Sequence, residues 1–215
     1  MKPNFEAIKT AGDGGAGLAI NKSGLYNVQI IKAYVKLKEG TSAKTLNLRV
    51  KVEGAEGQQV LFIRQTNKDG KENFEKILLD KLLVVCGVEE VKRLIPTKFT
   101  YKDKVYTEDC IQELENKKVI VQIKQEFDQW EGKINERFVV KNFFRIDDKA
   151  TAVEIVEQKD FGKKYESLDD EYVNATVYKN GVTAQQAKAY LDARRNGNQQ
   201  SEAATISAGE DEIPF

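Results

Sequence analysis

The chain has 215 residues, 40% of them apolar and 32% charged, and its 34 basic and 34 acidic side chains give a formal net charge of zero. That apolar content is sufficient for a hydrophobic core. The sequence contains no histidine, and its two cysteines, Cys86 and Cys110, lie in separate segments. Histidine-based catalysis and zinc sites built from histidine or paired cysteines are therefore excluded, and we expect no metal and no other cofactor.

Neither secretion nor membrane insertion is indicated. Residues 1–5 contain no apolar signal region, and the most apolar run, 77–88, is interrupted by Asp80 and Lys81. Both cysteines lie in apolar segments, where we expect them to be small buried hydrophobes in a reducing compartment. These features predict a cytoplasmic protein with no membrane partner.

Residues 1–22 are polar and rich in glycine, and they predict a flexible N-terminal arm. From 23 to 39 apolar and polar residues alternate, but the alternation slips by one position at Ile30 and Ile31, which predicts a bulge or sharp bend. Residues 44–53 and 58–65 alternate cleanly and predict two further strands of a meander. A long, bent first strand that joins both sides of a closed sheet is what a small five-stranded Greek-key barrel requires.

Helices are predicted after the third strand. Apolar residues recur at helical spacing from Phe74 to Val85, and Gly87 is placed to end that helix. A second short helix is predicted over 89–94, closed by Pro96. A third is predicted over 107–115, with a threonine as its N-terminal cap.

Residues 98–106 interleave three lysines with three aromatic residues. Two interpretations stay open. Tyr101 and Tyr106 contact a ligand in one of them, and in the other the segment is a solvent-facing hairpin whose tyrosines cover apolar surface.

Residues 119–146 predict a strand, a loop over 127–133 and a returning strand. The only tryptophan, Trp130, is expected in that loop beside Phe127 and Lys133. Because side chains alternate between the two faces of a strand, the odd-numbered residues of the returning strand are expected on one face. That face collects Arg137, Lys141, Phe143 and Arg145.

Residues 147–182 are expected to form an edge strand or a packed extension that completes a domain over 23–182. Thr183 and Gln186 have capping-box spacing for a helix over 183–195, which we expect to dock on the barrel or to mediate self-association. Residues 196–215 hold no basic residue and four acids, so the preceding part has 34 basic against 30 acidic residues. Their low apolar content predicts a disordered linker that ends in an acidic tip.

The tip carries a resemblance to a known family. Its residues Asp211-Glu212-Ile213-Pro214-Phe215 resemble the acidic Asp-Asp-x-Ile-Pro-Phe ending of bacterial single-stranded DNA-binding proteins, and bacteriophage proteins of that kind have similar acidic-aromatic ends. Residues 119–146 are similar in pattern to the fourth strand, long loop and fifth strand of the phage proteins. The resemblance implies a mainly β fold with inserted helices, namely a five-stranded oligonucleotide-binding (OB) barrel with α extensions and a disordered C-terminal tail.

The resemblance also implies a function. The barrel is expected to bind and protect single-stranded DNA during phage replication, recombination and repair in a bacterial host. The tip is expected to recruit partners such as a polymerase, a helicase or primase, or a nuclease. The candidate partner-binding residues are Glu210, Asp211, Glu212, Ile213, Pro214 and Phe215.

Binding of single strands needs cations for the phosphates and aromatic faces on which bases stack. The expected strands and loops supply both. The candidate DNA-binding residues are Arg49, Lys51, Phe62, Arg64, Tyr101, Tyr106, Lys124, Phe127, Trp130, Lys133, Arg137, Lys141, Phe143 and Arg145.

We expect no enzyme activity, but two other functions stay open. Asp147, Asp148 and the triplet 157–159 (Glu-Gln-Lys) resemble the acid and Glu-x-Lys pattern of metal-dependent nucleases. Such triplets arise readily by chance in a chain that is one-third charged. The other alternative is a replisome adaptor that uses the tip and does not itself bind DNA.

Overall fold

The computed structural model describes residues 19–198, with side chains as far as Arg194. The predicted linker beyond 198, the acidic tip and most of the predicted N-terminal arm lie outside this range. Residue Ile20, which the sequence assigned to the arm, is fully buried. Its N–H donates to Gln59 Oε1 at 3.0 Å, and Gln59 Nε2 donates to the Ile20 carbonyl at 3.3 Å. The folded part therefore begins before residue 23.

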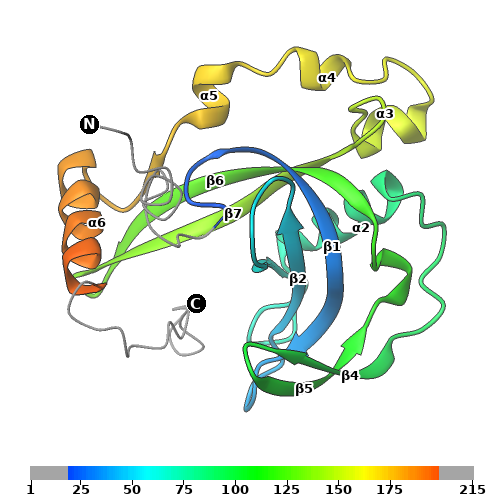
Figure 1. The fold of residues 1–215 in the computed structure, drawn as a ribbon, viewed down its shortest axis with the longest axis horizontal. Coiled ribbons are helices and arrows are strands. Elements are labelled where there is room, and N and C mark those ends of the chain that lie inside the picture. Colours follow the sequence, from blue (N-terminus) through cyan, green and yellow to red (C-terminus); the bar gives the residue numbers. More distant parts are fainter. Residues whose placement is uncertain (1–18, 199–215) are drawn as a thin grey trace, which may run out of the picture.

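One eight-stranded sheet, antiparallel except where β8 joins β6, makes up most of the fold (Figure 1). Hydrogen-bonded neighbours run in the order β3-β2-β1-β5-β4, and β6 pairs with β1, β7 and β8. No ladder joins β3 to β7 among these described strands, so the sheet is open. The mainly β prediction is confirmed. The strands are β1 (Gly24–Leu37), β2 (Lys44–Val52), β3 (Gln59–Arg64), β4 (Ile95–Tyr101), β5 (Lys104–Cys110), β6 (Lys118–Trp130), β7 (Lys133–Arg145) and β8 (Val177–Tyr178).

Strand β1 bends where the alternation of its sequence slips. Its register against β2 shifts between Ile30 and Lys32, which confirms the predicted bulge. Before the bulge, residues 24–29 pair with β6; after it, Tyr34 and Val35 pair with β5. One edge of β1 therefore has two successive partners, because the bend turns its second half away from β6.

The helix predicted after β3 is confirmed as a 3-10 turn, η1 (Phe74–Lys76), that continues into α2 (Ile77–Val85). Asn73 Oδ1 accepts a hydrogen bond from the Glu75 N–H at 3.0 Å, and Gly87, with φ of 65°, follows the helix end. The buried side of α2 packs on the sheet. The core there contains Leu46, Leu48, Val50, Leu61, Ile63, Leu78, Leu82, Val85, Val119, Val121, Ile123, Val140 and Phe143.

The two other predicted helices are wrong. Residues 89–94 form no helix, and 107–110 belong to β5, with only a 3-10 turn, η2 (Gln112–Leu114), after it. Residues of β4 alternate strictly between half-buried and exposed, which is the period of a strand. Lys102 and Asp103 join β4 to β5 with φ of 47° and 61°, as a two-residue hairpin turn requires. The segment is therefore a hairpin.

The predicted loop over 127–133 is also wrong. Strands β6 and β7 form one long hairpin joined by Glu131 and Gly132, whose φ values of 49° and 79° are again those of a tight two-residue turn. Trp130 thus lies at the end of β6, and Phe127 lies inside the strand with 1% of its surface exposed. The Glu-Gly pair shortens the loop to two residues, so both strands extend to it.

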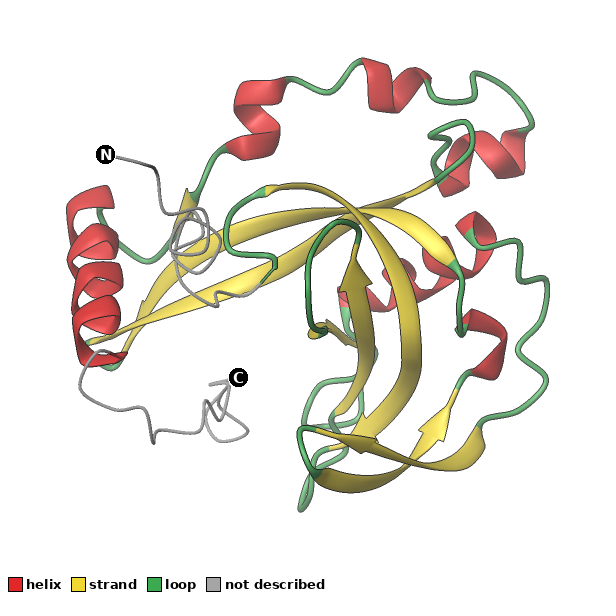
Figure 2. Cartoon of the chain, in the orientation of Figure 1, coloured by secondary structure: helices red, strands yellow, loops and turns green. Residues whose placement is uncertain are grey.

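Between β7 and residue 198 the structure describes four helices. The three short helices α3, α4 and α5 lie in a row along one side of the molecule. The longer α6 lies beside the turn of the β6–β7 hairpin (Figures 1 and 2). The predicted capping box is confirmed, since Thr183 N–H donates to Gln186 Oε1 at 2.8 Å and Gln186 N–H donates to Thr183 Oγ1 at 3.2 Å. The helices are α3 (Ala152–Glu157), α4 (Lys163–Glu166), α5 (Asp170–Asn174) and α6 (Ala184–Asn198).

A second, smaller cluster of buried side chains fixes α6 to the hairpin. Phe127 is its centre, packed with Val182 and Ala187 and flanked by Ile134 and Leu191. The rings of Tyr178 and Tyr190 each lie 6.1 Å from the Phe127 ring, the first stacked and the second edge-on. The outer half of the hairpin therefore has its own core, separate from the one under β2.

Replacing Phe127 with alanine should detach α6. The loss of a buried phenylalanine costs about 3–5 kcal/mol, which should appear as a lower midpoint in urea unfolding and as faster hydrogen exchange over 184–198. The exposed Val105→Ala is the matched control and should change neither quantity. Equal exchange of α6 amides in F127A and the native chain would contradict this role of Phe127.

Candidate functional site

Aromatic side chains from three strands gather on the face of the sheet opposite the α2 core. The Phe99 ring lies 5.2 Å from Tyr34 and is stacked on Tyr106 at 5.6 Å. We call Tyr34, Phe99, Tyr101 and Tyr106 the aromatic cluster. Burial, together with the nearby Glu108 carboxylate, raises the pKa of Tyr34 to about 12, so Tyr34 is neutral near pH 7.

Arg49 of β2 joins this cluster. Its guanidinium lies 5.2 Å from the Phe99 ring and 5.3 Å from the Tyr101 ring, and Nη1 donates to the Thr100 carbonyl at 3.2 Å. The residue is 7% exposed, and its Nε is buried without a hydrogen-bond partner. Arg49 therefore fastens the β4–β5 hairpin over β2 through cation–π contacts and one charge-assisted hydrogen bond.

Strands β3 and β7 bring a second group together. Phe62 and Arg64 lie on the side of β3 opposite the buried Leu61 and Ile63, and Phe62 is 50% exposed. Burial lowers the pKa of Arg137, and the nearby positive charge of Arg64 lowers it further. Arg64 and Arg137 therefore lie near each other beside an exposed ring, with the carboxylates of Glu75 and Glu126 also near Arg137.

The bulge in β7 separates residues that the sequence placed on one face. The register against β6 pairs Ile123 with Val140 but Gln122 with Asn142, so Lys141 is the extra residue. The alternation is reversed after it, and Arg145 and Arg137 lie on opposite faces. Phe143 falls on the inner face, where it is 1% exposed and belongs to the core. The predicted common face of these residues is therefore wrong.

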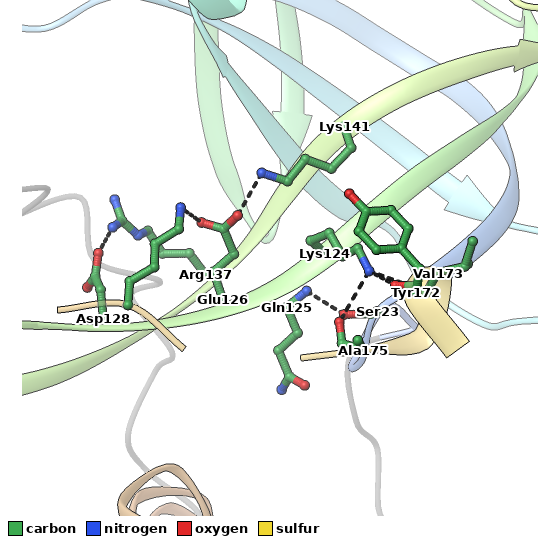
Figure 3. A network of polar contacts seen from close by, with 11 residues as sticks. Ser23, Lys124, Gln125, Glu126, Asp128, Arg137, Lys141, Tyr172, Val173 and Ala175 are labelled. Atoms are coloured by element: carbon green, nitrogen blue, oxygen red, sulfur yellow. Dashed lines mark hydrogen bonds and ion pairs between the residues drawn. The ribbon is translucent and has the colours of Figure 1, made fainter. Parts of the chain in front are cut away.

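Most cations of β7 already have partners in the folded chain (Figure 3). Arg137 forms an ion pair with Asp128, and Lys141 Nζ lies 2.7 Å from Glu126 Oε1. Arg145 Nε donates to Asp148 Oδ1 at 2.8 Å. These charges hold the hairpin and the segment after it, so their availability to phosphates is reduced.

Glu126 is the carboxylate around which the charges of the hairpin are arranged. It is 3% exposed and is paired with both Lys141 and Lys179. Burial opposes its ionisation, but the hydrogen bonds from the two lysines outweigh burial and lower its pKa. The ionised pair network therefore belongs to the folded structure at neutral pH.

Lys124 is a structural residue, contrary to its assignment to the DNA-binding set. It is 2% exposed, and its ammonium donates to the carbonyls of Tyr172, Val173 and Ala175 at the end of α5, at 3.2 Å for Val173 and 3.4 Å for Ala175 (Figure 3). The ammonium also lies 4.1 Å from the centre of the Tyr172 ring. A lysine at a helix C-terminus satisfies carbonyls that have no partner inside the helix. Neither Lys124 nor the buried Phe127 and Phe143 presents a surface to a ligand.

The remaining candidates lie apart from these two groups. Trp130 is 50% exposed and faces Lys133 across the turn of the β6–β7 hairpin, while Lys51 is exposed near the end of β2. The structure therefore brings the candidates together in two groups: Arg49 with Tyr101 and Tyr106, and Phe62 with Arg64 and Arg137. The candidates from the sequence did not include Tyr34 and Phe99, although Phe99 shares the alternation of Tyr101 in β4.

Two acids of the nuclease alternative have partners among the described residues. No group of three or more cysteine, aspartate or glutamate side chains within 19–194 is placed to hold a metal ion. Asp148 is paired with Arg145, and Glu157 with Lys159 at 3.2 Å. The predicted partner-binding residues 210–215 lie outside the described part. No helix of that part is long and apolar enough to cross a membrane.

Comparisons of the chain with protein-family models, with curated proteins and with solved structures found no match.

Replacing Arg49 with methionine should loosen the β4–β5 hairpin. Methionine keeps a long apolar side chain but removes the hydrogen bond to Thr100 and the contact of the charge with two rings. Hydrogen exchange over 95–110 should become roughly tenfold faster, the equivalent of about 1.4 kcal/mol. Lys51→Met, on the same strand with an exposed side chain, is the control and should leave that exchange unchanged.

Proposed function

We propose that the protein binds single-stranded DNA through the face of the sheet that carries the aromatic cluster and the Phe62–Arg64–Arg137 group. The observation that carries the proposal is this second group. An exposed ring suits base stacking, and guanidinium groups beside it suit contacts with the phosphates of the same strand. Phe62 and Arg64 lie on the same side of β3, so a ring for the bases and a cation for the phosphates are placed together there.

The arrangement of strands supports an OB-type barrel as the scaffold. A bent β1 pairs with β6 through its first half and with β2 on its other edge, and a helix follows the third strand, as in a five-stranded Greek-key barrel. In this proposal β6 and β7 are its fourth and fifth strands, the approach of Arg64 to Arg137 marks the side on which β3 meets β7, and β4–β5 is an inserted hairpin. OB folds bind oligonucleotides on the face of their second and third strands and at the loop between the last two. Phe62, Arg64 and Trp130 occupy those positions.

The acidic tip completes the proposal. We infer that 210–215 recruits replication or recombination enzymes, because three carboxylates followed by Ile-Pro-Phe combine charge with apolar anchors. In this proposal the folded part binds the phosphodiester backbone and bases of DNA, and the tip binds other proteins.

The Phe62→Ala variant tests the stacking surface. Loss of one base stack costs about 1–3 kcal/mol, so the dissociation constant for oligo-dT should rise roughly 5- to 150-fold. Phe161→Ala is the matched control, since Phe161 is also 50% exposed but lies between α3 and α4. The measurement is fluorescence anisotropy of labelled oligo-dT at fixed salt. Equal losses in both variants, or none in F62A, would remove Phe62 from the interface.

Affinity for oligo-dT should also depend on salt. If Lys51, Arg64, Lys133 and Arg137 each neutralise one phosphate, the affinity should fall about 50-fold between 50 and 200 mM salt, from a slope of about −0.7 per contact for single strands. A titration at several salt concentrations measures the slope, and Arg64→Gln should reduce it by about one contact. A flat response would contradict a phosphate-binding face.

A further inference from the structure

A shallow hollow of about 330 Å³ lies beside α2 and α3. Its wall includes Lys81 of α2, Asn142 of β7, Val153 of α3 and Lys164 of α4. We call it the α2–α3 hollow. It shares no residue with the face proposed to bind DNA.

Two lysine side chains and one amide oxygen in the wall of the hollow lack polar partners among the described residues. The ammonium groups of Lys81 and Lys164 form no ion pair within the described residues, in contrast to the β7 cations. Asn142 Oδ1 is buried and has no hydrogen-bond partner. Buried polar atoms are usually bonded, so the Asn142 oxygen can accept a hydrogen bond from an N–H of a ligand, while the two ammonium groups can bind its carboxylates.

The one carboxylate in the wall is already engaged. Glu154 accepts hydrogen bonds from the Thr151 N–H at 2.7 Å and the Lys164 N–H at 2.8 Å. Burial would raise its pKa, but these hydrogen bonds lower it overall. In the adjoining hollow, Lys159 pairs with Glu157 and Lys163 with Asp160, so those four charges offset one another. Asp80 is exposed on α2 next to Lys81. The wall of the α2–α3 hollow therefore holds two ammonium groups and one carboxylate, and Asp80 lies outside this wall.

Exposed apolar side chains border the same hollow. Val153 is 57% exposed and Val156, three residues later on the same side of α3, is 70% exposed. Ile77, one helical turn before Lys81 on α2, is 53% exposed. Cations beside an exposed apolar strip fit a segment that is acidic and apolar in sequence.

The chain itself contains such a segment in 210–215. Figure 1 shows α6 and α3 at opposite ends of the β6–β7 hairpin, and the 13 residues of β7 span about 40 Å. The step from Asn198 to Glu210 cannot exceed roughly 43 Å even when fully extended. A tip could therefore reach the hollow of its own chain only at full stretch along a straight path. A second copy has no such restriction.

We propose that the α2–α3 hollow binds residues 210–215 of a second copy of this chain. The carboxylates of Glu210, Asp211 and Glu212 contact Lys81 and Lys164, and Ile213 and Phe215 cover Val153 and Ile77. The contact is head-to-tail, so it propagates from copy to copy. A role of this contact in arranging copies side by side along single-stranded DNA rests on the proposed function. The binding of residues 210–215 to the hollow does not rest on it.

The test uses the full chain and a fluorescein-labelled peptide of residues 209–215, followed by anisotropy without DNA. The native chain should bind this peptide and not a scrambled one. Lys81→Gln/Lys164→Gln should bind it about tenfold more weakly, since exposed ion pairs contribute modest energies. Lys92→Gln/Lys117→Gln makes the same change of charge at exposed sites outside the hollow and should bind as the native chain does. No binding by the native chain, or equal binding by both double variants, overturns the proposal.

Measuring self-association distinguishes the tip of a second copy from the tip of the same chain as the occupant of the hollow. Sedimentation of the full chain should show concentration-dependent association that is lost in Lys81→Gln/Lys164→Gln and in Glu210→Gln/Asp211→Asn/Glu212→Gln. A chain that binds the peptide but stays monomeric at every concentration would assign the hollow to its own tip and overturn the second copy as occupant. Binding of a short oligo-dT, long enough for one copy only, is measured in parallel to separate the two proposals. A chain that binds the peptide but not this oligo-dT would refute the proposed function and leave the peptide site standing.

Discussion

The bend of β1 at Ile30–Lys32 is the constraint on which the rest of the structure depends. An unbent strand of this length would pair with one neighbour on each edge. The extra residue lets one edge pair first with β6 and then with β5, so the β6–β7 and β4–β5 hairpins leave the same strand in different directions. The apolar face is kept on both sides of the bulge because the sequence shifts its alternation by the same one residue.

Charge is used on this sheet in two ways. On the β6–β7 hairpin, lysines and arginines are bound to buried acids and to helix carbonyls, and these pairs fix the hairpin against α5 and the segment around β8. At the meeting of β3 and β7, Arg137, which is also paired with Asp128, lies near Arg64. Removing one partner from a buried pair leaves an uncompensated charge, so the pairs of the hairpin stabilise the fold. The Arg64–Arg137 group is the part of this sheet that we propose to contact phosphates.

The two proposed surfaces are built differently. The face of β2, β3 and the β4–β5 hairpin is aromatic and cationic, with Arg49 holding the hairpin over the sheet. The α2–α3 hollow combines unpaired ammonium groups with aliphatic side chains and holds no exposed ring. Flat bases stack on rings, and a peptide with aliphatic and carboxylate groups fits the second chemistry better.

The sequence by itself determined the period-two segments of β1, β2 and β3, the bulge, the helix after β3 with its glycine end, and the capping box of the last long helix. Each of these is a local pattern, set by alternation or by hydrogen bonds between residues a few positions apart. Phe62 and Arg64 could also be placed on one side of β3 from alternation alone. The tertiary structure alone decided which cations have partners, because Lys124, Glu126 and Arg137 meet residues distant in sequence or across a ladder. It also decided the length of the β6–β7 hairpin and the bulge at Lys141, which reverses the faces of β7 and buries Phe143, since register is set by the neighbouring strand and not by the strand itself.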